Sequence, residues 1–273
     1  MTELPGHPGH PGHQGQAAHG EHAGRVVLVT GGTRGIGAAI AAAFARAGAS
    51  VVVCARRPPE DSTATGGTVF VPADIRDPEQ QSRLVDTMVE RFGRLDVLVN
   101  NAGGTPLADA ASASSRYTQA IMTLNLVAPF QLAVLANTVM QRQPQGGQII
   151  SVGSVAADQP APGSAAYSAA KAGLAGMTRA LAMEFAPAVR VNEVTVGLVL
   201  TELSEQHYGG AAGLAAIADG IPLGRMATPE DVARACLLLA SDGAAYVTGA
   251  RLLVHGGGEV PPRAQAVRRA DGA

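Results

Sequence analysis

The sequence predicts an α/β fold in which a doubly wound parallel sheet is covered by helices on both faces. Short apolar segments of the kind that form buried parallel strands alternate along the chain with longer segments of helical composition. With 273 residues, of which 47% are hydrophobic and 15% charged, the chain is long enough for one large domain or at most two small ones.

The elements follow one another in regular order. Seven segments are expected to form strands: residues 25–30, 50–55, 68–72, 95–100, 148–152, 189–194 and 251–254. Five segments are expected to form helices: residues 38–48, 78–92, 113–140, 164–185 and one that starts at Thr228. Gly48 and Gly93 are suitable helix stops, and Thr228 followed by proline is a typical helix start.

The composition excludes several classes of function. A net charge of −2 implies neither nucleic acid nor an anionic membrane as partner. We expect no transmembrane span, because charged residues and glycines interrupt the apolar runs, and no secretory signal. Cys54 and Cys236 are expected to be reduced core residues, which fits a cytoplasmic location. No Cys/His spacing predicts a metal site.

The two ends of the chain have the composition of tails. Residues 1–23 contain a Pro-Gly-His repeat and five of the seven histidines, and we interpret them as a disordered leader. Chelation of Ni or Zn by this leader remains an alternative. Residues 24–258 would form the single catalytic domain, and residues 259–273 a second loose tail.

A glycine-rich turn joins the first strand to the first helix. Gly31, Gly35 and Gly37 permit a tight turn and the close approach of backbone N–H groups to a pyrophosphate, and the helix N-terminus favours negative charge. A plain strand-to-helix turn is the alternative, although one glycine usually suffices there. We favour a dinucleotide site.

Two arginines indicate which dinucleotide binds. Arg56 closes the second strand, where an acid would bind the 2′-hydroxyl of NAD and an arginine suits the 2′-phosphate of NADP. Arg34 in the glycine turn reaches the same region, and no acid follows until Glu60. NADP is therefore predicted over NAD.

Polar residues also follow the third and fourth strands. Asp74 is expected either to accept a hydrogen bond from the adenine amine or to cap the helix that Pro78 opens, and the sequence does not separate these readings. The segment Asn100–Gly103 carries amide and small residues at the carboxyl end of a strand, where ligands bind in open α/β sheets.

The chemistry is predicted at Ser154, Tyr167 and Lys171. Tyr167 and Lys171 are four residues apart and share one face of the expected helix, so that the ammonium would lower the pKa of the phenol. Such a tyrosine can give or take a proton on a carbonyl or alcohol oxygen, and Ser154 can hydrogen-bond the same oxygen. A chance spacing is the alternative for the pair alone.

Asn125 lies inside the long helix, four residues before Pro129. The proline cannot donate to the Asn125 carbonyl, so the helix is expected to be loosened there. Two interpretations remain: a proline kink with a surface asparagine, or an exposed carbonyl and amide that hold a water beside Lys171.

Together these motifs resemble the short-chain dehydrogenase/reductase family, including its 3-oxoacyl-reductase-like members, over residues 25–258. The resemblance implies a single Rossmann-type domain with a parallel seven-stranded sheet, a nicotinamide hydride carrier and a homotetramer. It implies that Tyr167 is the general acid/base, that Lys171 lowers its pKa and holds the nicotinamide ribose, that Ser154 orients the substrate oxygen, and that Asn125 anchors a relay water. The resemblance places these residues at the cofactor: Gly31, Thr33, Arg34, Gly35, Ile36, Gly37, Arg56, Asp74, Ile75, Asn101, Ala102, Gly103, Tyr167, Lys171, Val199 and Thr201.

Two positions depart from the family pattern. Val196-Gly197 stands where the family usually has Pro-Gly, and His255 stands where it has Asp, a position expected to be structural or at a subunit interface. Residues 104–120 and 201–220 would shape the substrate pocket, the latter as a mobile lid or an ordinary surface excursion.

The function predicted is NADPH-dependent reduction of a ketone or 3-oxoacyl-type carbonyl to a secondary alcohol. Oxidation of a secondary alcohol, steroid or alicyclic, by NAD(P)⁺ is the second reading. A non-enzymatic nucleotide-binding module is the third, and the complete Asn/Ser/Tyr/Lys set argues against it.

Overall fold

A computed structural model describes residues 20–58, 68–202, 204 and 209–260. Its strands are β1 (Val26–Thr30), β2 (Ser50–Ala55), β3 (Val69–Pro72), β4 (Val97–Asn100), β5 (Gly147–Ser154), β6 (Val189–Val196) and β7 (Arg251–Val254). Its α-helices are α1 (Gly35–Arg46), α2 (Pro78–Phe92), α3 (Ser115–Met122), α4 (Ala128–Met140), α5 (Ala165–Phe185), α7 (Gly210–Asp219) and α8 (Pro229–Ala240). The predicted strands and helices are confirmed, with boundaries shifted by up to three residues.

All seven strands form one parallel sheet in the order β3-β2-β1-β4-β5-β6-β7. This confirms the doubly wound seven-stranded fold. The chain winds outward from β1 in one direction through β2 and β3, and then in the other direction from β4 to β7. The direction changes between β1 and β4, and their carboxyl ends open the crevice in which open α/β sheets bind ligands.

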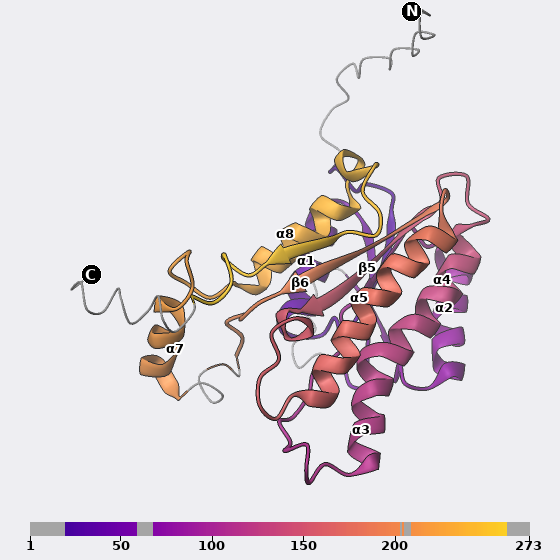
Figure 1. The fold of residues 1–273 in the computed structure, drawn as a ribbon. Helices are drawn as coiled ribbons and strands as arrows, with labels where there is room; N and C mark the ends of the chain where they lie inside the picture. Colours follow the sequence, from indigo (N-terminus) through magenta and orange to yellow (C-terminus); the bar gives the residue numbers. More distant parts are fainter. Residues whose placement is uncertain (1–19, 59–67, 203, 205–208, 261–273) are drawn as a thin grey trace, which may run out of the picture.

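Helices cover the two faces of the sheet as separate layers (Figure 1). One apolar core lies under α2, α4 and α5, and the other under α1 and α8. Neighbouring strand residues alternate between them: Leu28 and Ile149 belong to the first core, and Val29 and Ile150 to the second. The alternation shows that every central strand is buried on both faces, which explains its continuous apolar sequence.

The predicted long helix is divided by a π-helical turn at Thr123–Val127, which separates α3 from α4. The expected loosening at Asn125 is confirmed. By length and composition alone, Ser115–Met140 is apolar enough to cross a membrane. In the fold Leu132, Ala136 and Met140 are buried in the core, so that this segment packs as a core helix of the domain.

The domain begins before residue 24 and extends past residue 258. His22, which the sequence analysis placed in the leader, is buried with its ring 5.2 Å from the ring of Phe44. At the other end, the buried Val260 donates its amide to the Gly220 carbonyl at 2.8 Å. Both contacts join segments distant in sequence, so composition does not reveal them. The Pro-Gly-His repeat and most of the C-terminal tail lie outside the described residues.

Candidate active site

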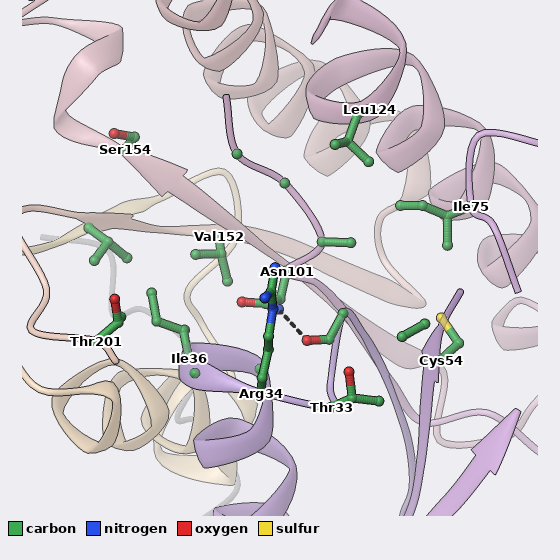
Figure 2. Close-up of a pocket in the computed structure, with 18 of the residues that line it drawn as sticks. Thr33, Arg34, Ile36, Cys54, Ile75, Asn101, Leu124, Val152, Ser154 and Thr201 are labelled. Carbon is green, nitrogen blue, oxygen red and sulfur yellow. Dashed lines mark hydrogen bonds between the residues drawn. The ribbon is translucent and has the colours of Figure 1, made fainter. Parts of the chain in front are cut away.

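A cavity of about 640 Å³ opens at the carboxyl ends of the central strands. Figure 2 shows Ser154 and Thr201 at one end, Cys54 and Ile75 at the other, and Asn101 between them. The volume lies within the range of small-molecule and cofactor sites, roughly 300–1,000 Å³. The residues that line the cavity come from the ends of β2 and β3 on one side and from the ends of β5 and β6 on the other.

Every residue predicted for the site lines this cavity except Asn125, which lies behind its wall. The predicted residues that line it are Gly31, Thr33, Arg34, Gly35, Ile36, Gly37, Arg56, Asp74, Ile75, Asn101, Ala102, Gly103, Ser154, Tyr167, Lys171, Val199 and Thr201. Residues from seven parts of the chain thus converge in a single cavity, which the order of the strands explains.

The glycine turn has the backbone that a phosphate cradle requires. Gly31 and Gly35 have φ angles of +65° and +52°, in the left-handed region that disfavours side chains. A Cβ on Gly37 would lie 2.2 Å from the Gly31 carbonyl oxygen. The N-cap of α1 makes no side-chain hydrogen bond, and its first turn contains no acid. The amides at this helix N-terminus fit a dinucleotide pyrophosphate.

Two polar side chains fix the glycine turn to β4. The buried Thr30 hydroxyl accepts hydrogen bonds from the amides of Asn101 and Ala102, at 3.0 and 2.9 Å. The Asn101 side chain donates to the carbonyls of Thr30 and Gly31, at 2.8 and 3.3 Å. These bonds set the two strand ends that border the cavity, so Asn101 supports the turn as well as lining the cavity.

Asp74 does not cap the helix that Pro78 opens. Asp77 does so, accepting hydrogen bonds from the amides of Glu79 at 2.9 Å and Gln80 at 3.4 Å. The capping interpretation of Asp74 is therefore wrong, because the cap lies immediately before the proline. Asp74 instead binds Arg76 through both carboxylate oxygens, and this pairing holds the pKa of the carboxyl below its usual range.

The predicted reactive residues come from the end of β5 and the first two turns of α5. Tyr167 and Lys171 share a helix face, with the Lys171 ammonium 5.6 Å from the centre of the Tyr167 ring. Lys171 donates to the Val152 carbonyl at 2.8 Å, two residues before Ser154. The three side chains therefore line the same cavity, and their catalytic roles stay predictions.

Burial has the larger effect on the pKa of Tyr167. It raises the pKa above the usual value, while a hydrogen bond with Ser154 acts in the opposite direction. The predicted lowering by Lys171 is not found. The Lys171 ammonium lies over the ring and is directed to a backbone carbonyl, and burial lowers its own pKa to about 8.

Asn125 differs from both of its sequence interpretations, because its side chain is fully buried. The amide oxygen accepts from the Gly104 amide at 2.9 Å, and the amide nitrogen donates to the carbonyls of Gly104 and Ile121, each at 3.0 Å. The prediction of an exposed amide is wrong. Asn125 clamps the loop that follows β4, and its relay role through the backbone carbonyl stays a prediction.

The sequence did not predict several residues that line the cavity: Cys54, Ala73, Arg76, Leu124, Val152 and Gly153. All but Leu124 lie within two residues of a predicted residue at a strand end. Adjacency to a predicted strand end is the signal that would have found them.

The two departures from the family pattern lie side by side. Val196 and Gly197 line the cavity, and a Cβ on Gly197 would lie 2.7 Å from the Cβ of His255. The Gly197 amide donates to the Val254 carbonyl at 3.0 Å, and the His255 ring accepts from the Gly257 amide at 3.1 Å. His255 thus has a structural contact, and the strand end keeps its position without the proline.

The fold and the cavity together place the chain among the oxidoreductases that use a nicotinamide dinucleotide. Residues 31–259 match the family model described as enoyl-(acyl carrier protein) reductase, and the chain belongs to the short-chain dehydrogenase/reductase family. It is an oxidoreductase acting on CH–OH or C=O groups.

Relatives of named activity cover nearly the whole domain. A protein named as a ketoacyl reductase of the granaticin polyketide synthase of Streptomyces violaceoruber is 40% identical, over 85% of this chain and 95% of its own length. The 3-oxoacyl-[acyl-carrier-protein] reductase of Synechocystis sp. is 38% identical, over 85% and 96%. L-fucose dehydrogenase of Bos taurus is also 38% identical, over 88% and 91%. The structure of aldohexose dehydrogenase of Thermoplasma acidophilum superposes with a TM-score of 0.82 at 28% identity, over 88% of this chain and 96% of that one.

Proposed function

We propose that this protein is an NADPH-dependent reductase that converts a ketone or 3-oxoacyl-type carbonyl to a secondary alcohol. One observation carries the proposal: Ser154, Tyr167 and Lys171 share a single cavity with the glycine turn and with Arg34 and Arg56. The relatives named as ketoacyl and 3-oxoacyl reductases support this direction of reaction.

The chain's own groups would handle the oxygen of the substrate. The cofactor, when bound, supplies the hydride. Burial keeps the Tyr167 phenol protonated at neutral pH, the form that donates a proton to a carbonyl oxygen. The Ser154 hydroxyl would hold the same oxygen, and Lys171 would bind the nicotinamide ribose. Asn125 would act on this step by holding the loop that carries Gly104.

The preference for NADPH is supported by charge at the adenosine end of the cavity. Arg34 and Arg56 line it from two different turns, and the carboxylate of Asp74 is already paired with Arg76. A 2′-phosphate would therefore meet guanidinium groups, which bind phosphate through charge-assisted hydrogen bonds. Glu60 lies outside the described residues.

Oxidation of a secondary alcohol by NAD(P)⁺ is the second candidate. The relatives named L-fucose dehydrogenase and aldohexose dehydrogenase favour it, because they carry the same fold over most of this chain. The site is compatible with both directions, since the group that donates a proton in reduction accepts one in oxidation.

A cytoplasmic homotetramer is part of the proposal. Val127 at the end of the π-helical turn and Phe130 and Val134 on α4 form an exposed apolar stripe, and β7 is an edge strand with Leu253 exposed. Unpaired edge strands and exposed apolar stripes are surfaces that association covers.

The cofactor assignment is tested by titrating the full-length protein with NADPH and with NADH, read by nicotinamide fluorescence. Arg56→Ala is expected to weaken NADPH binding by about 1–3 kcal/mol, the range for a charge-assisted contact, and to change NADH binding little. Arg57→Ala is the matched control, because Arg57 does not line the cavity. Equal losses for the two cofactors would contradict the 2′-phosphate assignment, and tighter binding of NADH by the unmodified protein would favour the dehydrogenase.

A further inference from the structure

A carboxylate occupies a core position on β6. Val189 and Val191 point into the core beneath α5, and the next two residues on the same face of the strand are Glu193 and Thr195. Both are fully buried. Burying a charge is costly unless partners compensate it, so the surroundings of Glu193 indicate what its charge does.

Glu193 belongs to a chain of polar contacts that crosses the edge of the sheet. Its Oε1 accepts from the Thr195 hydroxyl at 2.5 Å and from Nε of Arg251 on β7 at 3.2 Å. Arg251 continues to Asp158, donating to its two carboxylate oxygens at 2.6 and 3.2 Å. Among the residues that the structure describes, none donates to Oε2 of Glu193.

The carboxylate of Glu193 lies against the end of β5 that carries the active site. A Cβ on Gly153 would lie 2.2 Å from Oε1 of Glu193, so the carboxylate fills the space that this glycine leaves. Gly153 stands between Val152, whose carbonyl accepts from Lys171, and Ser154. Asp158, at the far end of the chain of contacts, follows the short 3₁₀ helix Val155–Ala157 that begins after Ser154.

We propose that Glu193 is a positioning residue of the active site, whose carboxylate, seated against Gly153 and oriented by Arg251, is the counter-charge of the Lys171 ammonium. This inference rests on the role of Lys171 in the proposed function. Lys171 is almost completely buried, and its only hydrogen bond among the described residues is to a neutral carbonyl. Burial lowers its pKa, and the charge of Glu193 acts in the opposite direction.

The titratable and charged groups around Lys171 come from four parts of the chain. Tyr167 shares its helix, Glu193 lies on β6, Arg251 on β7, and Asp158 after the 3₁₀ helix. Two carboxylates face one guanidinium in this hydrogen-bonded cluster, which therefore carries one net negative charge. Arg179, further along α5, also acts on Asp158. Neutralising either carboxylate should make the ammonium less stable, and neutralising Arg251 should make it more stable.

The test reads Lys171 directly, because it is the only lysine in the sequence. Lysine labelled with ¹³C at the ε carbon gives the full-length protein a single side-chain signal, whose pH titration in the cofactor-free protein yields the pKa of Lys171. Glu193→Gln keeps the size of the side chain and removes its charge. We expect the pKa of Lys171 to fall by on the order of one pH unit.

Three further variants fix the sign of the effect. Asp158→Asn should produce a smaller fall, because Asp158 is more than half exposed, and Arg251→Gln should produce a rise. Asp96→Asn is the matched control: Asp96 is also a buried carboxylate paired with an arginine, but it precedes β4 at the opposite end of the sheet. It should leave the titration of Lys171 unchanged.

A merely structural role for Glu193 gives a different result. Loosening the core would let water reach the ammonium and would raise its pKa. A rise or no change in Glu193→Gln would overturn the proposal, as would an equal fall in Asp96→Asn. If Glu193→Gln does not fold, the sign of the shift in Asp158→Asn decides. Because the titration needs neither cofactor nor turnover, absence of NADPH binding would refute the proposed function without affecting this result.

Discussion

Lys171 is almost completely buried and Tyr167 is partly buried, and burial favours the neutral form of both. The pKa of Tyr167 is raised, and that of Lys171 is lowered to about 8. At neutral pH the phenol therefore keeps its proton while the amine is still mostly charged. This pairing suits proton donation to a carbonyl oxygen and agrees with the reductive direction proposed above.

Tyr167→Phe should reduce turnover by about 10²-fold or more, the usual contribution of a positioned acid, because it removes the proton and keeps the ring. Binding of NADPH should stay within about twofold, since the ring still packs beside Lys171. Steady-state reduction of a 3-oxoacyl thioester and fluorescence titration measure the two quantities. Tyr246→Phe is the control, because the Tyr246 side chain is fully exposed and does not line the cavity. Full activity in Tyr167→Phe would contradict the assigned role.

At the scale of residues, the sequence predicts which side chains gather and not what each one contacts. The four-residue spacing of Tyr167 and Lys171 fixes their common helix face, and that prediction is confirmed. The predicted lowering of the Tyr167 pKa is wrong. The shift depends on how much water reaches the phenol, and the spacing of residues does not determine this. The sequence did not indicate a role for Glu193 either, because the residues of its hydrogen-bonded cluster, Arg251 and Asp158, are remote from it in sequence.

At the scale of elements, the π-helical turn between α3 and α4 brings Asn125 to the loop after β4. A Cβ on Gly103 would lie 2.8 Å from Oδ1 of Asn125 and 3.6 Å from Nζ of Lys171. The loop after β4 can therefore approach Asn125 and Lys171 closely only because Gly103 has no side chain. The proline predicted the irregular turn, but nothing in the sequence indicated that the asparagine would be turned inward to hold a loop.

Asn125→Ala should lower the free energy of unfolding by about 1–3 kcal/mol, because it removes the hydrogen bonds of the buried Asn125 side chain to Gly104 and to the buried Ile121 carbonyl. Loosening of the loop should also lower kcat, since this loop borders Lys171. Thermal unfolding and steady-state kinetics measure the two effects. Asn137→Ala on α4 is the control, because the only hydrogen bond of the Asn137 side chain among the residues described is the one it accepts from Gln141. If Asn125→Ala kept both the stability and the kcat of the wild type, the hydrogen bonds between Asn125 and the loop would be unimportant.

At the scale of the whole molecule, the alternation of strands and helices predicts a parallel sheet but not the order of its strands, which the structure supplies. Local sequence sets the type of each element, but pairing such as that of β1 with β4 joins segments about seventy residues apart and depends on packing. The same limit explains the misplaced start of the domain. His22 lies in a histidine-rich segment, and its contacts with Phe44 and Ala47, which are distant in sequence, bring it into the fold.

The contact of His22 with the body of the molecule should make folding stability depend on pH. Burial is the main cause that lowers the pKa of His22 below its usual value of 6.5, and the nearby Arg25 acts in the same direction. The unfolded chain therefore binds a proton at a higher pH than the folded chain does. The contribution of neutral His22 to the free energy of unfolding should be complete above about pH 6.5. It should be lost as the pH drops toward the lower pKa that His22 has in the folded state, with a slope of up to about 1.4 kcal/mol per pH unit from this one group.

His22→Phe removes the titrating group and keeps an aromatic ring against Phe44. Chemical denaturation at several pH values on both sides of 6.5 should show a steep decline for the wild type and a shallower one for the variant, with the difference between them growing as the pH falls. If the two proteins lose stability in parallel, His22 does not stay neutral in the fold.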